Sequence, residues 1–451
     1  MAATRAKRWP LYGESVRPGP SGCLVFGQRQ AQWITEMTDP QPLYDLAPLL
    51  RLMLLGTVIA LGPLAWVWWR SRGASQGRRL QALTVLTLFL TFDLVMFGAF
   101  TRLTDSGLGC PDWPGCYGSA SPLGARSEIS AAEQAMPTGP VTHGKAWVEM
   151  VHRYLATGVG VLIIVMTVAA WRQWRAHMRN VASAPGVPQR KPLSPWWATV
   201  TLVWVCLQGA FGALTVTMKL FPAIVTLHLI GGLVLLALLC VQAVRHSQAV
   251  QGSGPVVLAG DLRWMLWLAM LLVSVQVVLG GWVSTNYAVL ACTTFPTCQG
   301  SWWPAMDFAQ GFQIWRPLGL LKDGSHIGFA ALTAIHYMHR LFAYAVLLVL
   351  LVLGWRVRRA AAQVRSAQPL QAAPLAAQGR WIVGLAALQL LTGLSNVVLD
   401  WPLVAAVLHT GGAAALVVVL TWALTASSAQ VPARHAATLQ KAPAGAAKAE
   451  A

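Results

Sequence analysis

Long apolar runs and short polar breaks alternate along this chain, and nine of the runs reach the length of a membrane span. A helix needs roughly 20 apolar residues to cross a bilayer, so each run predicts one transmembrane helix. The runs lie at about 47–69, 80–102, 146–171, 196–217, 222–245, 263–285, 327–355, 379–399 and 402–425. We therefore expect an all-α integral membrane protein.

The composition agrees with a membrane location and argues against a nucleic-acid partner. Hydrophobic residues make up 56% of the chain and charged residues 11%, whereas soluble domains carry about 25% charged residues. The net charge of +18 comes largely from short loops, as the positive-inside rule expects of cytoplasmic loops. The basic residues of three such loops are Arg70, Arg72, Arg78 and Arg79; Arg172, Arg175, Arg179, Arg190 and Lys191; and Arg356, Arg358, Arg359 and Arg365.

These basic loops set the predicted orientation of the spans. The longer segments 103–145 and 286–326 carry mixed or little charge and are expected outside. The N-terminus then lies outside and the C-terminus in the cytoplasm. Residues 1–46 are expected to be a disordered or partly misassigned extension, with Met37 as an alternative translation start. Residues 426–451, rich in alanine and lysine, are expected to form a disordered tail.

The chain also contains an internal repeat. Segment 97–118 aligns without gaps with segment 279–300, and both carry two cysteines with a proline between them. The Met-Val-His-Arg sequence at 150–153 matches Tyr-Met-His-Arg at 337–340. Self-similarity over such distances predicts two structural units of the same kind.

The units are expected to be two pseudo-symmetric four-helix transmembrane bundles, residues 80–245 and 263–425. Because each unit has an even number of spans, the two have the same orientation and the repeat is parallel. One extra transmembrane helix and its basic loop, residues 47–79, precede the repeat.

Four histidines are expected inside the helices, His152 and His228 in the first half and His339 and His409 in the second. Ionisable groups are costly in a membrane and often functional. A single buried histidine more often forms an interhelical hydrogen bond. Four at repeated positions favour two pairs, each holding a haem iron from both sides near the outer face. Zinc is disfavoured because carboxylates and thiols do not cluster with them.

Charged and polar neighbours differ between the halves. Arg153 and Arg340 follow two of the histidines and are candidates to bind haem propionates. Glu149 lies one turn before His152 and is a candidate to position a proton, water or substrate edge. The alternative is a buried acid bonded to a neighbouring hydroxyl or arginine. His336 stands at the position of Glu149, as a substitute ligand, a proton-transfer group or a packed side chain.

The other histidines and several glycines have simpler interpretations. Four histidines fall in predicted loops or tails and are expected to be solvated: His143, His177, His246 and His435. Small residues near the four histidines would let helices, or a flat macrocycle, approach closely. These glycines are Gly209, Gly212, Gly231, Gly232, Gly393, Gly411 and Gly412.

Two cysteine pairs of identical spacing, Cys110/Cys116 and Cys292/Cys298, lie in the predicted outer segments. Oxidising conditions there permit disulfides, and a separation of six residues can close a short loop. Structural bridges are the preferred interpretation for the second pair. The first pair follows a polar, glycine-rich turn at 101–109 that is also suited to contact a cofactor or partner.

Together these motifs resemble the haem A synthase family. The resemblance rests on segment 101–108 (Thr-Arg-Leu-Thr-Asp-Ser-Gly-Leu), the Cys-Pro-Asp-Trp-Pro-Gly-Cys loop at 110–116, the acid–histidine motif at 149–153 and the remaining three histidines. It covers roughly residues 80–425. It implies a multi-pass enzyme of the bacterial inner membrane that oxidises the C8 methyl of haem O to a formyl group. The product, haem A, serves cytochrome oxidase.

The resemblance also implies roles for individual residues. His152 and His228 would hold the substrate haem, with Glu149 as the catalytic acid, whereas His339 and His409 would hold a resident haem b. Cys110 and Cys116 would form the loop disulfide found in one branch of the family. Membrane lipid surrounds such a protein, and contacts with a haem O synthase or cytochrome oxidase assembly factors, or a homo-oligomer, are compatible with it.

Two other functions stay open at this point. A di-haem b-type cytochrome that relays electrons from quinol needs the same four histidines, and so does a haem carrier without catalysis. Glu149, present in one half only, favours specialised chemistry over a symmetric relay. The extra span 47–69 has no role in the eight-helix pattern of the family.

Overall fold

The computed structural model describes residues 47–183, 191–366 and 369–429. Within these residues, nine helices are long and apolar enough to cross a membrane. They are α2 (Ala47–Arg70), α3 (Gln76–Leu103), α5 (His143–Ser183), α6 (Trp196–Thr217), α7 (Pro222–Gln251), α8 (Gly260–Thr285), α10 (Phe329–Val364), α11 (Pro369–Val398) and α12 (Leu403–Thr425). The chain is an all-α, multi-pass membrane protein, as predicted. The expectations for 1–46, including a start at Met37, and for 430–451 lie outside the described residues.

Several helices extend well beyond their apolar runs. α5 continues to Ser183 and α10 to Val364, whereas the apolar runs predicted ends near 171 and 355. The added turns are rich in arginine, glutamine and alanine, which favour helix without being apolar. Hydropathy detects the part of a helix that lipid can cover, so it misses these polar extensions.

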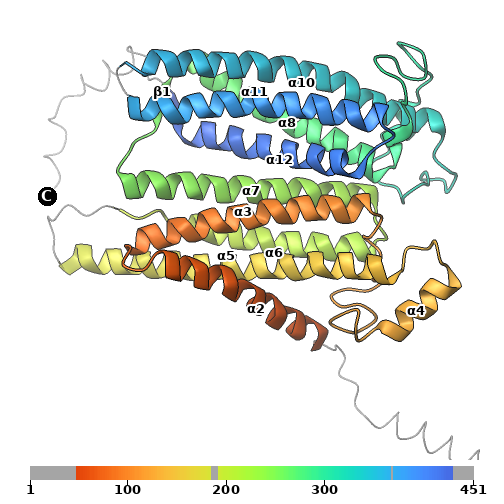
Figure 1. Cartoon of the computed structure of the whole chain (residues 1–451), viewed down its shortest axis with the longest axis horizontal. Coiled ribbons are helices and arrows are strands. Elements are labelled where there is room, and N and C mark those ends of the chain that lie inside the picture. Colours follow the sequence, from red (N-terminus) through yellow and green to blue (C-terminus); the bar gives the residue numbers. More distant parts are fainter. Residues whose placement is uncertain (1–46, 184–190, 367–368, 430–451) are drawn as a thin grey trace, which may run out of the picture. The chain divides into compact units, whose positions relative to one another are not determined.

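Four helices of the first half surround a common core (Figure 1). α3 packs against α5 and α7, and α6 packs against the same two helices. α5 and α7 therefore lie on one diagonal of a four-helix ring. Buried aliphatic side chains, among them Leu162, Ile163 and Leu239, pack together in this half. Such a ring brings side chains of diagonal helices toward one another across the core.

The second half has the same kind of ring. α8 packs against α10 and α12, and α11 packs against the same two helices, so α10 and α12 lie on a diagonal. Its core includes Leu266, Leu350 and Leu420. The rings are joined by contacts of α7 with α8 and α12 and of α3 with α12. A contact of 3.3 Å between the Thr226 and Thr285 hydroxyls lies at this junction.

The extra helix α2 packs on α5. A Cβ atom built on Gly158 would lie 3.2 Å from Ile59, and one built on Gly56 would overlap Thr157. Glycine at both positions permits the close approach, as is common between membrane helices. α2 is therefore attached to the outside of the first ring.

The structure contains short elements that the hydropathy pattern did not predict. In the loops are α4 (Arg126–Ala135), η1 (Ala288–Leu290) and α9 (Phe308–Gly311). β1 (Val256–Leu258) pairs in parallel with β2 (Ser427–Ala429). β2 lies in the region 426–451 that was expected to be disordered, so that expectation is wrong for residues 427–429. Pairing with a valine-rich segment distant in sequence orders them.

Candidate functional site

Each of the four predicted histidine ligands lies against a glycine of a neighbouring helix. A Cβ atom built on Gly98 of α3 would lie 3.0 Å from His152 Cε1. One built on Gly280 of α8 would lie 2.9 Å from His339 Cε1. Both distances are shorter than ordinary carbon–carbon contacts. The glycines therefore provide the space that the imidazole rings occupy.

The other two histidines have the same arrangement with looser contacts. A Cβ atom built on Gly393 of α11 would lie 3.2 Å from His409 Cε1, and one on Gly212 of α6 would lie 3.4 Å from His228 Cε1. The sequence pointed to Gly212 and Gly393 as small residues near the sites. Gly98 and Gly280 were recognised only as matching positions of the repeat. Their repetition was the sequence signal that could have identified them as neighbours of the histidines.

His339 and His409 face each other within the second ring. Their ring centroids are 6.4 Å apart and the ring planes are inclined at 80°. A metal–imidazole bond is about 2 Å and the ring centre lies about 1 Å further, so two axial imidazoles of one iron have centroids about 6 Å apart. The separation of these two rings therefore matches that of two ligands of one iron. Among the described residues, no group of three or more His, Cys, Asp or Glu side chains is placed to hold a metal ion.

The rings of this second pair have hydrogen-bonding neighbours. The Thr392 hydroxyl lies 2.9 Å from His409 Nδ1 and 2.7 Å from the Leu388 carbonyl oxygen. Because it donates to the carbonyl, it accepts from Nδ1–H, which leaves Nε2 free to bind a metal. The Gln276 side-chain nitrogen donates to the His339 carbonyl at 3.1 Å and lies 3.1 Å from Nδ1 and 3.4 Å from Nε2 of the His339 ring. An amide nitrogen can only donate, so this contact does not fix the Nδ1–H form of the ring. Sequence reasoning missed both residues.

The rings of the first pair lack such neighbours. Nδ1 of His152 and Nδ1 of His228 are buried, with no hydrogen-bond partner among the described residues. The backbone of His228 is nevertheless held, since Gln208 donates to its carbonyl at 2.9 Å. Gln389 makes the corresponding bond to the His409 carbonyl at 3.0 Å. Buried polar atoms are usually paired, so the unpaired nitrogens are consistent with a site that receives a ligand.

Glu149 is buried at 4% exposure and forms an ion pair with Arg153 at 2.5 Å. Its other oxygen accepts the Cys110 backbone N–H at 2.8 Å. The acid is therefore bonded to an arginine and to the outer loop, one turn from His152. Glu149 therefore has the structural role that was the alternative to catalysis, that of a buried acid bonded to an arginine. Its catalytic role stays a prediction.

The two arginines next to the histidines hold the outer loops. Arg153 donates to the carbonyls of Asp112 at 3.0 Å, Pro114 at 3.2 Å and Gly115. Arg340 donates to the carbonyls of Cys292 at 3.1 Å, Thr294 at 2.8 Å and Thr297 at 3.0 Å. These contacts occupy much of each guanidinium. The observed role of Arg153 and Arg340 is to bind the loops. Their contacts with haem propionates stay predictions.

Both loops are closed by disulfides, Cys110–Cys116 and Cys292–Cys298, with Cα–Cα distances of 4.9 and 4.8 Å. All four cysteines are buried. The Asp112 carboxylate accepts the N–H groups of Tyr117 and Gly118 at 2.6 and 2.7 Å. Each disulfide loop is thus compact. Arg153 of α5 holds the first loop and Arg340 of α10 holds the second, each by donating to backbone carbonyls of the loop.

The remaining six histidines differ in their surroundings, and one of them, His326, is exposed in the loop before α10. His336 is buried at 6% exposure, and its Nδ1 has no partner among the described residues. His246, expected to be solvated, is also buried at 6%, because α7 extends past its apolar run to Gln251. His143 and His177 are half-buried at or near the ends of apolar runs, and His435 lies outside the described residues.

A polar contact links the end of α3 and the loop after it with the end of α8 and the loop after it. Arg102 donates to the Ser284 carbonyl at 2.5 Å, and its guanidinium lies 4.1 Å from the centre of the Tyr287 ring. The Tyr287 hydroxyl donates to Asp105 at 2.7 Å. Burial raises the pKa of this hydroxyl, so it stays protonated and keeps donating at neutral pH. The segment 101–109 thus contacts the other half of the chain, which the sequence did not predict.

Comparison with known proteins identifies the family. The sequence matches the COX15-CtaA profile, described as cytochrome oxidase assembly protein, over residues 81–421. The chain belongs to this family. The matched region contains all four histidines and both cysteine pairs and excludes α2, and the resemblance inferred from the motifs is confirmed.

Three similar proteins share one name, heme A synthase. A protein of Shewanella oneidensis named heme A synthase is 34% identical over 343 residues, which are 74% of this chain and 92% of that protein. One of Rhodospirillum centenum with the same name is 28% identical over 82% of this chain and 92% of its own length. A third, from Alkalihalophilus pseudofirmus, is 28% identical over 62% of this chain and 78% of its own length.

A substitution at Gly280 tests whether the glycine seats the His339 ring. Alanine has the higher intrinsic helix preference by about 0.5–1 kcal/mol, but its methyl would overlap the ring. We expect Gly280→Ala to lower haem retention at the second pair at least about tenfold, measured as pyridine haemochrome per purified protein. Gly384→Ala in α11 is the control, because no atom lies within 4 Å of the added carbon. Equal haem retention in both variants would contradict the seating role.

Proposed function

We propose that this chain is a haem A synthase, which converts the C8 methyl of haem O to a formyl group by successive hydroxylation. Family membership and the name shared by the relatives support the general function. The observation that carries the proposal is the set of two histidine pairs on helix diagonals, with an acid beside only one of them. A symmetric electron relay would need no such difference between the halves.

We assign the substrate haem to His152 and His228, and a resident haem b to His339 and His409. The partners of the rings support this assignment. Outer partners fix ligand orientation and typically change metal affinity 10–100-fold, in order-of-magnitude terms. The second pair has such a partner in Thr392, whose hydroxyl accepts from His409 Nδ1–H, whereas Gln276 donates to the backbone carbonyl of His339.

The first pair has apolar residues at the corresponding positions. In the alignment of the halves, Leu94 matches Gln276 and Phe211 matches Thr392. A substrate must leave after reaction, whereas a resident cofactor must stay. The more weakly oriented pair therefore suits the substrate, and the firmly oriented pair suits the resident haem.

The chain's own residues would bind and orient the macrocycle and handle protons, while the haem supplies the redox chemistry. Two hydroxylations of one methyl carbon followed by loss of water yield the formyl group. Glu149, one turn from His152, is assigned to hold a proton at the substrate edge. Arg153 would position that carboxylate through the ion pair.

The proposed placement in the membrane follows the charge pattern. Basic residues lie after α2 and in the polar extensions of α5 and α10, which we assign to the cytoplasmic side of a bacterial inner membrane. The disulfide loops and the haem sites then lie toward the outer face, with the N-terminus outside and the C-terminus inside. We retain the parallel repeat, because helix contacts and arginine–loop contacts recur in both halves.

Pigment analysis of the purified protein tests the function. The haems are extracted, separated by chromatography and identified by mass. We expect haem b together with haem O, its hydroxylated derivative or haem A. Haem b alone, from cells that supply haem O, would favour an electron relay. Absence of haem would contradict the ligand assignment as a whole.

The Thr392 hydroxyl gives a test of the resident site. Thr392→Val keeps the side-chain shape but removes the acceptor for His409 Nδ1–H. We expect haem b to dissociate about 10–100-fold more readily, measured by transfer to apomyoglobin. Thr410→Val is the matched control, since its hydroxyl donates to the Ala406 backbone carbonyl. An unchanged rate in Thr392→Val would remove the support that this contact gives to the assignment.

A further inference from the structure

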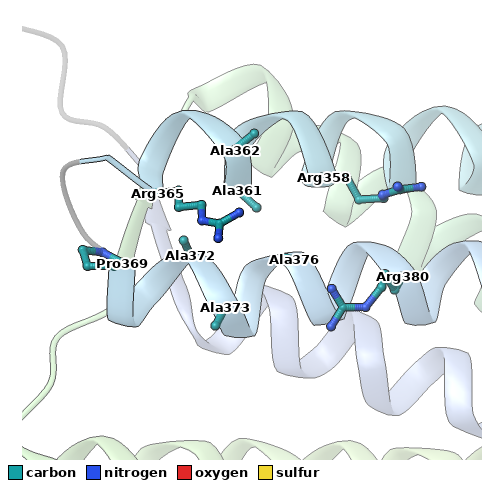
Figure 2. Close-up of a pocket in the computed structure, with 9 residues that line it drawn as sticks. All are labelled: Arg358, Ala361, Ala362, Arg365, Pro369, Ala372, Ala373, Ala376 and Arg380. Carbon is teal, nitrogen blue, oxygen red and sulfur yellow. The ribbon is translucent and has the colours of Figure 1, made fainter.

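A cavity of about 560 Å³ lies between α10 and α11, at the ends of these helices away from His339 and His409. Figure 2 shows three arginines at this cavity: Arg358, Arg365 and Arg380. The Arg365 guanidinium lies in the space between the two helices, whereas Arg380 lies along α11 and Arg358 along α10. The proposed oxidation of haem O has no use for this cavity.

The charge of the cavity is uncompensated by the described part of the chain. No carboxylate there forms an ion pair with these three arginines, whereas the nearby Arg356 pairs with Asp261. The rest of the lining consists of alanines and Pro369, which add no negative charge. Three like charges around one space repel each other and favour a bound anion.

The packing of the helices helps to orient one of the arginines. A Cβ atom built on Gly379 would lie 2.6 Å from Arg358 Cγ, so glycine leaves room for the stem of this side chain against α11. α11 begins at Pro369, which brings the positive end of its dipole to the cavity. The negative end of the α10 dipole lies beside it, so the two helix ends offset each other. The local charge is then positive because of the arginines.

Tryptophans lie beside the end of the cavity that is nearer the apolar parts of α10 and α11. Trp355 of α10 and Trp381 of α11 are 51% and 57% exposed, and they neighbour Arg358 and Arg380 in the chain. Tryptophan is enriched where membrane helices meet the aqueous phase. An anion that reaches this cavity from the membrane would carry its charge at the same depth.

We propose that the cavity binds the phosphate-bearing headgroup of an anionic phospholipid. Guanidinium groups bind phosphate oxygens through paired N–H donors, and basic pockets between transmembrane helices are typical sites for such headgroups. A volume of about 560 Å³ lies within the usual range of ligand sites, about 300–1,000 Å³. The acyl chains would lie along the lipid-facing sides of α10 and α11.

Lipid binding to the purified full-length protein tests the proposal. Cardiolipin and phosphatidylcholine are titrated separately in detergent and bound lipids are counted by native mass spectrometry. The triple variant Arg358→Gln, Arg365→Gln, Arg380→Gln is expected to bind cardiolipin about a hundredfold more weakly. The matched control is Arg359→Gln, which removes one charge from the same helix. Arg359 stacks on Trp355 at 4.1 Å and does not line the cavity.

The outcomes distinguish a lipid from a free anion. Preference for cardiolipin over phosphatidylcholine, lost in the triple variant and kept in Arg359→Gln, supports the proposal. Equal cardiolipin binding in wild type and triple variant would overturn it. Inorganic phosphate is tested through its effect on the unfolding temperature. If phosphate raises the unfolding temperature of the wild type but not of the triple variant, and neither protein prefers cardiolipin, the cavity binds free phosphate. That outcome would overturn the lipid proposal.

Discussion

Replacing Arg153 with alanine is expected to destabilise the folded chain by about 3–5 kcal/mol, because it leaves a buried carboxylate without its cation. Glu149 is 4% exposed and pairs with Arg153 at 2.5 Å. The same guanidinium also binds three carbonyls of the disulfide loop. The loss is measured as the free energy of unfolding in detergent, from denaturant titrations followed by tryptophan fluorescence.

Two controls separate the buried charge from the other contacts of Arg153. Arg356→Ala breaks an ion pair whose side chains are 35% and 60% exposed, so its effect should stay within about 1 kcal/mol. The double variant Glu149→Gln, Arg153→Ala removes both charges and should be more stable than Arg153→Ala alone. If the double variant is the less stable of the two, the unpaired carboxylate is not the cause.

Replacing Glu149 with glutamine is expected to lower the rate of haem A formation by about 10²–10⁴-fold, the usual contribution of a general acid or base. Glutamine is nearly isosteric, but its single oxygen can accept from Arg153 or from the Cys110 N–H and not from both. The catalytic assignment therefore requires that product formation falls much further than bound haem. The measurement compares haem A produced per unit of protein, with the absorption spectrum as the check on haem content.

The control for this variant is an acid of the same outer loop. Glu128 is exposed and accepts from the Ser127 hydroxyl at 2.8 Å, so Glu128→Gln should leave product formation and haem content unchanged. Unchanged product formation in Glu149→Gln would contradict the catalytic assignment and leave the carboxylate with the structural role seen in its bonds to Arg153 and Cys110. A parallel loss of haem and product would likewise indicate a structural role.

The number of spans and the positions of the four histidines were predictable from the sequence. Both depend on patterns that are local in the chain: a run of about 20 apolar residues, or one ionisable side chain within such a run. The glycines that seat the rings were harder to find. Gly280 and His339 belong to different helices, and only packing brings them together.

Contacts between distant segments account for most of what the sequence missed. Nothing in the sequence indicated that the outer loop folds back over α5 and offers Arg153 carbonyls 38–41 residues away. Gln276 reaches His339 across 63 residues. His246 is buried because α7 extends past its apolar run. A pattern among neighbouring residues cannot reveal contacts over such sequence separations.

The sequence by itself therefore determined the membrane class, the nine spans, the family and the candidate ligands, because hydropathy and motif spacing are properties of neighbouring residues. Only the tertiary structure decided which hydrogen bonds each candidate makes. It alone showed that the His409 ring has a partner in Thr392, whereas Nδ1 of His152 and Nδ1 of His228 have none among the described residues. The physical reason is that a buried polar group takes its partner from whichever segment packs beside it, and packing is set by the whole fold.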